Sequence, residues 1–97
     1  MVIGFDKIFL KPMSWDILCY LSEHDHLKAA EIGEQMGLSA RQVDAAVTKS
    51  LVRYGFVIRE AKLTRLMKKE YNLICITPVG EKFVKWRKAR LEALGEP

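Results

Sequence analysis

Residues 27–57 constrain the fold of this 97-residue chain more than any other segment of its sequence. Residues 29–36 carry apolar side chains at the spacing of a one-faced helix. Gly37 follows, where a sharply turning chain needs a residue free to adopt positive φ. Ser39 and Gln42 then have the spacing of a capping box, which predicts the start of a second helix. Two helices joined by a tight, glycine-containing turn form a helix-turn-helix.

The second helix is predicted over residues 40–54, and its two faces differ in chemistry. Val43, Val47 and Leu51 recur at every fourth position, which indicates a face turned toward a core. The opposite face carries polar, basic and small apolar side chains, namely Arg41, Gln42, Ala45, Thr48, Lys49 and Val52. Gly55 is expected to end the helix. The outward face is therefore the part of the motif that is available to a partner.

A β-hairpin is predicted directly after this helix. Residues 56–61 and 71–76 are β-rich, and the basic loop KLTRLMKKE separates them. Thr77 can cap the next helix and Pro78 suits its first position, so residues 78–94 are expected to form a long C-terminal helix. Leu27 is expected to add a short strand that pairs with the hairpin.

This order of elements resembles the winged-helix regulators of the MarR and PadR type. The likeness spans residues 14–94 and is carried by two phrases, LVRYGFV at residues 51–57 and TPVG at residues 77–80. It implies an α+β, mainly helical fold: a winged helix-turn-helix with a β-hairpin wing and an extended C-terminal helix. The sequence departs from the pattern at Lys28, where these families often have Ser or Thr, because a lysine side chain cannot accept a capping hydrogen bond.

Positive charge is concentrated in the second helix and the wing. The chain carries a net charge of +4, but residues 39–70 hold eight basic against three acidic side chains, a net +5. The remainder therefore sums to −1. Basic side chains can simply keep a small domain soluble, but here they coincide with an independently predicted binding element. A basic footprint of this kind supplies sequence-independent affinity for nucleic acid.

Double-stranded DNA is the partner that these features predict, with the second helix in the major groove. The residues expected to read base edges lie on the outward face of that helix: Arg41, Gln42, Thr48 and Lys49. The residues expected to bind the DNA backbone are the other basic side chains of the helix and wing: Arg53, Arg59, Lys62, Arg65, Lys68 and Lys69. Two rival functions use the same surface, a protein–protein interaction module in a larger assembly and an RNA-binding protein.

Both ends of the chain are unusual for a minimal winged helix, the first because it is apolar and the last because its predicted helix is too long. We expect an apolar arm over residues 1–13, a winged-helix domain over residues 14–77, and a C-terminal helix over residues 78–97 that serves for dimerisation. Ser14 is expected to cap a first helix over residues 15–22. Val79 and Phe83 are expected to close the core. A homodimer would bury the predicted interface residues Phe5, Phe9, Trp86, Leu91 and Leu94; the alternative is that the arm folds back on the last helix of its own chain.

Other functional classes find little support in the sequence. No set of residues has the pattern of a catalytic site, so an enzyme is not expected, and neither is a cofactor. Cys19 and Cys75 are expected to be buried small hydrophobes. His24 and His26 lie in a polar loop without a nearby cysteine or third ligand, so no metal site is predicted. No apolar run approaches the ~18–20 residues of a membrane span, and a cytoplasmic protein is expected.

Overall fold

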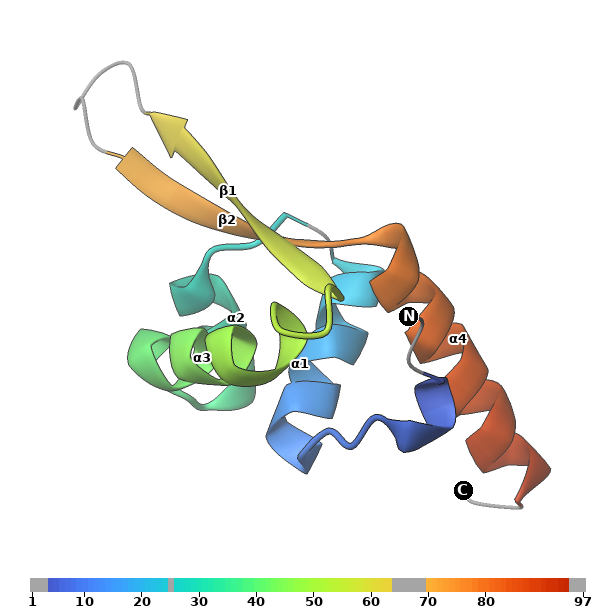
Figure 1. The fold of residues 1–97 in the computed structure, drawn as a ribbon. Helices are drawn as coiled ribbons and strands as arrows, with labels where there is room; N and C mark the ends of the chain where they lie inside the picture. Colours follow the sequence, from blue (N-terminus) through green and yellow to red (C-terminus); the bar gives the residue numbers. More distant parts are fainter. Residues whose placement is uncertain (1–3, 25, 64–69, 95–97) are drawn as a thin grey trace.

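A computed structural model describes residues 4–24, 26–63 and 70–94 of the chain. Figure 1 shows a helical body from which a two-stranded hairpin projects. The elements, in chain order, are η1 (Phe5–Lys7), α1 (Pro12–Glu23), α2 (Ala29–Met36), α3 (Ala40–Ala46), η2 (Val47–Leu51), β1 (Val57–Leu63), β2 (Glu70–Ile76) and α4 (Pro78–Ala93). The predicted mainly helical winged-helix architecture is confirmed.

Helix α1 lies at the centre of the body, with α2 and α3 on one side and α4 on the other (Figure 1). One hydrophobic core joins all of these helices to the base of the hairpin. Fully buried side chains come from each α-helix, from η2 and from the residue before β1: Ile17, Leu18, Leu21, Ile32, Val43, Val47, Leu51, Phe56 and Phe83. The arm contributes as well, because Leu10 is only 2% exposed.

The strands pair antiparallel in the register that places Val57 opposite Ile76 and Leu63 opposite Glu70. Leu27 extends this sheet as predicted, because it exchanges two backbone hydrogen bonds with Ile74, of 3.2 and 2.7 Å. The observed strands extend the predicted ones by a residue or two toward the tip of the hairpin.

The turn between α2 and α3 has the predicted geometry. Gly37 ends α2 with φ 69°, in the left-handed region that glycine adopts without steric cost. Lys28 occupies the N-cap of α2, and its side chain makes no cap hydrogen bond, as its chemistry predicts. Instead the Glu31 carboxylate accepts a hydrogen bond of 2.9 Å from the Lys28 backbone N–H.

The prediction that Ser14 caps the first helix is wrong. Helix α1 begins at Pro12 with Lys11 as its N-cap, because proline has no N–H to lose and its φ already suits the first helical turn. Ser14 therefore lies inside the helix, where it is buried, and its Oγ donates a hydrogen bond of 3.3 Å to Ser50 Oγ. This bond joins α1 to η2 across the core.

The start of α4 confirms one expectation and corrects another. Thr77 caps the helix by accepting a hydrogen bond of 3.1 Å from the Gly80 N–H, and Pro78 follows it. Val79, however, is 46% exposed and does not close the core. Gly80 faces the core in its place, because a Cβ there would lie only 2.2 Å from the Phe56 carbonyl oxygen. The helix therefore packs on the backbone at this point.

No helix among the described residues combines the length and the apolar character needed to cross a membrane.

Candidate nucleic-acid interface

The second helix of the motif starts at a complete capping box. Gln42 N–H donates to Ser39 Oγ at 3.1 Å, and Ser39 N–H donates to Gln42 Oε1 at 2.9 Å. This reciprocal pair satisfies two backbone N–H groups that would otherwise lack partners at the helix start. The predicted inward stripe is also confirmed, because Val43, Val47 and Leu51 are all 0% exposed.

The predicted single helix over residues 40–54 is in fact two segments. After α3, the chain widens into the π-helical turn of η2, with a hydrogen bond of 2.9 Å from Val52 N–H to the Val47 carbonyl. Widened turns of this kind are rare and frequently accompany functional sites. They change the angular spacing of the side chains, which a regular 3.6-residue period cannot anticipate.

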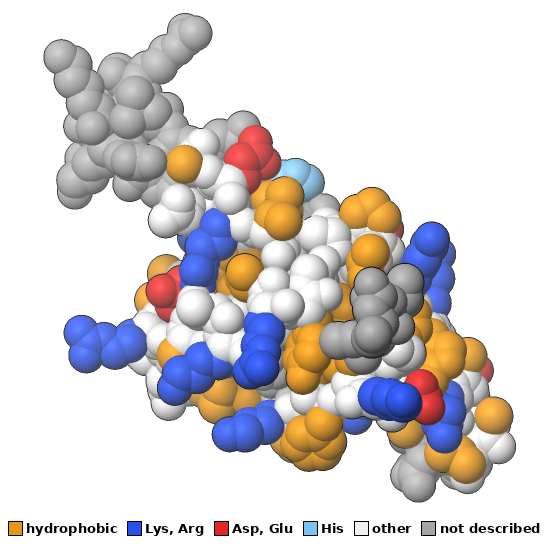
Figure 2. Space-filling view, in the orientation of Figure 1, with side chains coloured by type: hydrophobic (Ala, Val, Ile, Leu, Met, Phe, Trp, Pro, Cys, Tyr) orange, Lys and Arg blue, Asp and Glu red, His pale blue; other side chains and the backbone are white. Residues whose placement is uncertain are grey.

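The outward face of α3 and η2 is open to solvent. All six residues predicted for this face are exposed: Arg41, Gln42, Ala45, Thr48, Lys49 and Val52. Figure 2 shows Lys and Arg side chains gathered over this part of the surface, with few acidic side chains among them. The helix therefore presents a mixed basic and small apolar surface to a partner.

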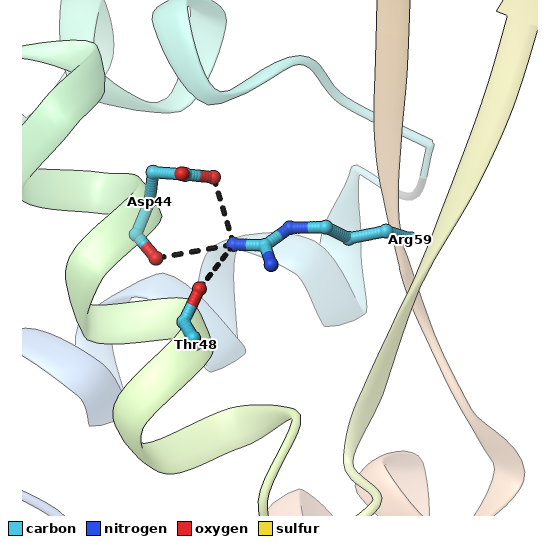
Figure 3. A network of polar contacts seen from close by, with 3 residues as sticks. All are labelled: Asp44, Thr48 and Arg59. Carbon is cyan, nitrogen blue, oxygen red and sulfur yellow. Dashed lines mark hydrogen bonds and ion pairs between the residues drawn. The ribbon is translucent and has the colours of Figure 1, made fainter.

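Arg59 of β1 reaches across to α3 (Figure 3). Its Nη2 atom lies 2.7 Å from Asp44 Oδ1, 3.1 Å from the Asp44 carbonyl oxygen and 2.5 Å from Thr48 Oγ1. One guanidinium nitrogen thus joins the wing to the second helix. Thr48, predicted to read bases, and Arg59, predicted to bind phosphate, are therefore bound to each other within the chain.

The Gln42 side chain is also engaged in a hydrogen bond within the chain. Its Oε1 atom accepts from the Ser39 backbone, which uses one of the two lone pairs of that oxygen and leaves the side-chain NH2 group for a base edge. Arg41 and Lys49 are exposed, and no described hydrogen bond or ion pair within the chain engages either side chain. These two residues are therefore the most available of the four predicted base readers.

The structure describes only some of the residues predicted to bind the DNA backbone. Arg53 is exposed after η2, and Arg59 has the partners given above. The backbone of Lys62 lies in β1, opposite Tyr71. Arg65, Lys68 and Lys69 lie outside the described residues.

The arm packs against α4 of its own chain. The Phe5 ring lies edge-on to Phe83, with centroids 5.3 Å apart, and 5.7 Å from the Trp86 ring. Phe9 and Leu94 are nevertheless 79% and 68% exposed. Together with half-buried Leu91 they border a groove between the arm and the C-terminal half of α4. The five predicted interface residues therefore form one continuous surface, with Phe5 and Trp86 anchoring it.

One cluster of potential metal ligands was not predicted from the sequence. His26, Glu60 and Cys75 offer ligand atoms that all lie within 4.8 Å of one another. His26 therefore does have a nearby cysteine, contrary to the prediction from the sequence. Cys75 is far from it in sequence and becomes its neighbour only through strand pairing. Cys19 lies elsewhere, on α1, and the two cysteines are not joined by a disulfide.

No family model matches the sequence, and no curated protein sequence is significantly similar to it. Solved structures match its fold. Staphylococcus aureus MepR in its complex with DNA matches with a TM-score of 0.74 at 18% identity, over 94% of this chain and 69% of that chain. A transcriptional regulator homologue from Pyrococcus horikoshii matches with a TM-score of 0.74 at 19% identity, over 87% and 80%.

A MarR-family transcriptional regulator from a Rhodococcus species is 26% identical, with a TM-score of 0.69, over 87% of this chain and 56% of that chain. Another crystal structure of MepR, described as a transcription regulator of the multidrug efflux pump MepA, has a TM-score of 0.72, and this chain spans 61% of its length. At sequence identities this low, the structural matches establish the fold of the chain and not its function. The chain has the winged-helix fold found in MarR-family transcriptional regulators.

Proposed function

We propose that this protein is a transcriptional regulator that binds specific sites in double-stranded DNA. The observation that carries the proposal is the exposed, basic outward face of α3 and η2 on a fold whose solved examples include a complex with DNA. The segment of residues 40–54 would enter the major groove, and the hairpin would lie along the DNA backbone. Such a protein acts on the genome, in the cytoplasm, and needs no catalytic activity.

The side chains would divide between two tasks. Arg41 and Lys49 would read base edges directly, since arginine and lysine pair well with guanine. Gln42 and Thr48 would join them once the contacts to Ser39 and Arg59 rearrange. The backbone would be bound by the remaining basic side chains, namely Arg53, Arg59, Lys62, Arg65, Lys68 and Lys69.

The test is a titration of the purified protein with duplex DNA at several salt concentrations. The net +5 of residues 39–70 would neutralise about 5 phosphates per protomer. The logarithm of the affinity should then fall with the logarithm of the salt concentration, with a slope of about −4 to −5 per protomer. An absence of binding to any duplex at low salt would refute the proposal.

A homodimer is part of the same proposal. Phe9 and Leu94 leave large apolar side chains in solvent beside the groove between arm and α4. A second copy would cover them and would place two recognition helices at half-sites about one helical turn apart, or a multiple of that spacing. Linked half-sites gain affinity through effective concentration.

Sedimentation equilibrium at micromolar concentration tests the dimer. The intact chain should sediment as a dimer, and a variant with Trp86→Lys and Leu91→Lys should be monomeric and bind DNA less tightly. Phe9→Ser is a second variant that should disturb the fold less, because the Phe9 side chain is largely exposed and contributes little to the core. An intact chain that sediments as a monomer would show that the arm serves only its own α4.

A protein–protein interaction module remains the second candidate function. Ala45 and Val52 are apolar and exposed on the outward face, and Val52 is 38% exposed. They suit a protein partner as well as a thymine methyl group. The salt titration separates the two, because a protein-binding module would show no affinity for duplex DNA.

A further inference from the structure

Three side chains with metal-binding chemistry meet on the face of the hairpin that points away from the core. They are His26, just before α2, Glu60 on β1 and Cys75 on β2. Their nitrogen, oxygen and sulfur ligand atoms all lie within 4.8 Å of one another. The DNA-binding proposal assigns no task to any of the three.

Strand register explains why they meet. Ile58 pairs with Cys75 and Glu60 pairs with Leu73, and residues two apart on a strand share a face, so Glu60 and Cys75 are diagonal neighbours on one face. The other face is the core side, where Val57 and Ile74 are buried. Glu60 Oε2 lies 3.8 Å from Cys75 Sγ as a result.

Strand pairing on the opposite edge of β2 brings in His26. Leu27 bridges Ile74, so the residue before Leu27 lies beside the residue after Ile74, which is Cys75. The cluster therefore spans three adjacent chain segments. His26 is also the only non-glycine residue in the described part of the chain with positive φ, at 63°. Histidine tolerates this region better than most residues, and unusual backbone conformations cluster at functional sites.

The three groups differ in exposure in a way that suits an ion arriving from solvent. His26 is exposed, Glu60 is half-buried, and Cys75 is only 4% exposed. An ion could meet the imidazole first and then be enclosed by the carboxylate and the sulfur. A site with its thiolate at the bottom also keeps the reactive sulfur away from bulk oxidants.

The donor set is that of zinc. Zn²⁺ accepts sulfur, imidazole nitrogen and carboxylate oxygen in tetrahedral sites, whereas Mg²⁺ and Ca²⁺ take oxygen ligands. Bond lengths of about 2.3 Å to sulfur and about 2.0 Å to oxygen imply a tetrahedral S···O separation of about 3.5 Å. The observed 3.8 Å between Cys75 Sγ and Glu60 Oε2 is close to this value. The two separations that involve His26 are at most 4.8 Å, so zinc binding would bring the imidazole closer by no more than about 1.5 Å.

We propose that His26, Glu60 and Cys75 bind one Zn²⁺ ion per chain. The Cys75 thiol gives its proton to solvent and binds as the thiolate, His26 binds as the neutral imidazole, and Glu60 supplies a carboxylate oxygen. Three protein ligands leave the fourth position for water or for another ligand. The ion would fasten the connection before α2 to both strands of the hairpin. If the proposed DNA-binding function holds, zinc would thereby stiffen the wing relative to the helix-turn-helix.

Cobalt provides the direct test, because Co²⁺ occupies zinc sites and a thiolate ligand gives an intense sulfur-to-cobalt charge-transfer band. The reduced, full-length protein is titrated with Co²⁺ without oxygen, and Zn²⁺ is then added in competition. We expect one Co²⁺ per chain, a charge-transfer band, and loss of the band as Zn²⁺ displaces cobalt. The measurement contains no DNA, so its failure is distinct from failure of the proposed function.

The chain offers matched controls, because it has one further cysteine and one further histidine. Cys75→Ser should abolish the band, whereas Cys19→Ser and His24→Ala should bind like the unmodified protein. Burial raises the pKa of the Cys19 thiol, which makes that thiol a poorer competitor for metal. His26→Ala and Glu60→Gln should weaken zinc binding by more than about tenfold, since removal even of outer-shell partners costs about 10- to 100-fold.

Two results would overturn the proposal. One is the absence of a thiolate-to-cobalt band in the unmodified protein. The other is a zinc affinity that His26→Ala and Glu60→Gln leave unchanged. His26 is exposed, and alanine at its φ of 63° costs roughly 1–2 kcal/mol, so the alanine variant is expected to fold. It keeps the test decisive even if the Cys75→Ser protein does not fold.

Discussion

The outward face of α3 and η2 and the aromatic cluster beneath the arm lie on the same small body, yet their side chains are used in opposite ways. Phe56 and Phe83 stack with centroids 4.5 Å apart, and Phe5 meets both rings. Arg41 and Lys49, in contrast, extend into solvent. The cluster stabilises the fold, whereas the exposed Arg41 and Lys49 can change at little cost to the fold and are free to serve a partner.

This difference makes the two regions separable by mutation. Changes in the aromatic cluster should lower the free energy of unfolding and leave DNA specificity alone in whatever protein remains folded. Changes on the outward face should do the reverse. Four variants, ordered from the largest expected effect to the smallest, examine whether the separation is real.

Phe83→Ala should have the largest effect. The ring is 0% exposed and contacts Phe5, Trp15, Phe56 and Trp86, so its loss leaves a large cavity. The free energy of unfolding should fall by about 3–5 kcal/mol. Urea unfolding followed by circular dichroism measures this change. A loss below about 1 kcal/mol would mean that the cluster is not the centre of stability.

Gly80→Ala tests the same region through the sign of the change in the free energy of unfolding. Alanine favours a helix over glycine by about 1 kcal/mol, so an unobstructed site would become more stable. Here the new Cβ would lie 2.2 Å from the Phe56 carbonyl oxygen, and the crowding should instead cost about 1–3 kcal/mol. Thermal unfolding decides between the two signs. A raised melting temperature would show that α4 can move away from the hairpin base at little cost.

Arg41→Ala should act on binding alone. Because the side chain is exposed, the free energy of unfolding should change by less than about 0.5 kcal/mol. Affinity for the preferred duplex should fall by about 1–3 kcal/mol, and discrimination against other sequences should weaken. Titrations against the preferred and a scrambled duplex measure both. Lys68→Ala with Lys69→Ala is the comparison, and it should weaken both duplexes about equally. A change in the preferred sequence would make the wing a reader.

Asp44→Ala should have the smallest effect, and it should raise the affinity for duplex DNA. It removes an ion pair in which the Arg59 side chain is 29% exposed and the Asp44 side chain 58% exposed, so stability should fall by no more than about 1 kcal/mol. Arg59 would then keep only its hydrogen bonds to Thr48 and to the backbone carbonyl of residue 44, so it could turn toward DNA more easily, and a carboxylate that repels phosphate would be gone. A several-fold gain in duplex affinity is expected from the same titrations. A loss of affinity would mean that the contact to Arg59 holds the wing in its binding position.

Local sequence signals predicted much of the fold. The capping box at Ser39, the positive φ at Gly37 and the start of α4 after Thr77 each depend on neighbouring residues, and all three are observed. The first helix was predicted to start too late because Ser14 is a good cap in isolation and Pro12 is a better first residue. Local chemistry offered two starts, and the buried contact from Ser14 to Ser50 suits only one of them.

What the sequence by itself determined is the order of the elements, their inward stripes and the charge of the outward face, because helix period and charge are properties of neighbouring residues. Only the tertiary structure decided which distant side chains meet. The contact from Arg59 to Asp44 and the grouping of His26 with Glu60 and Cys75 depend on strand register and on how the hairpin lies over the helices. The spacing of these residues along the chain does not predict either contact, because the segments that carry them come together only when the chain folds.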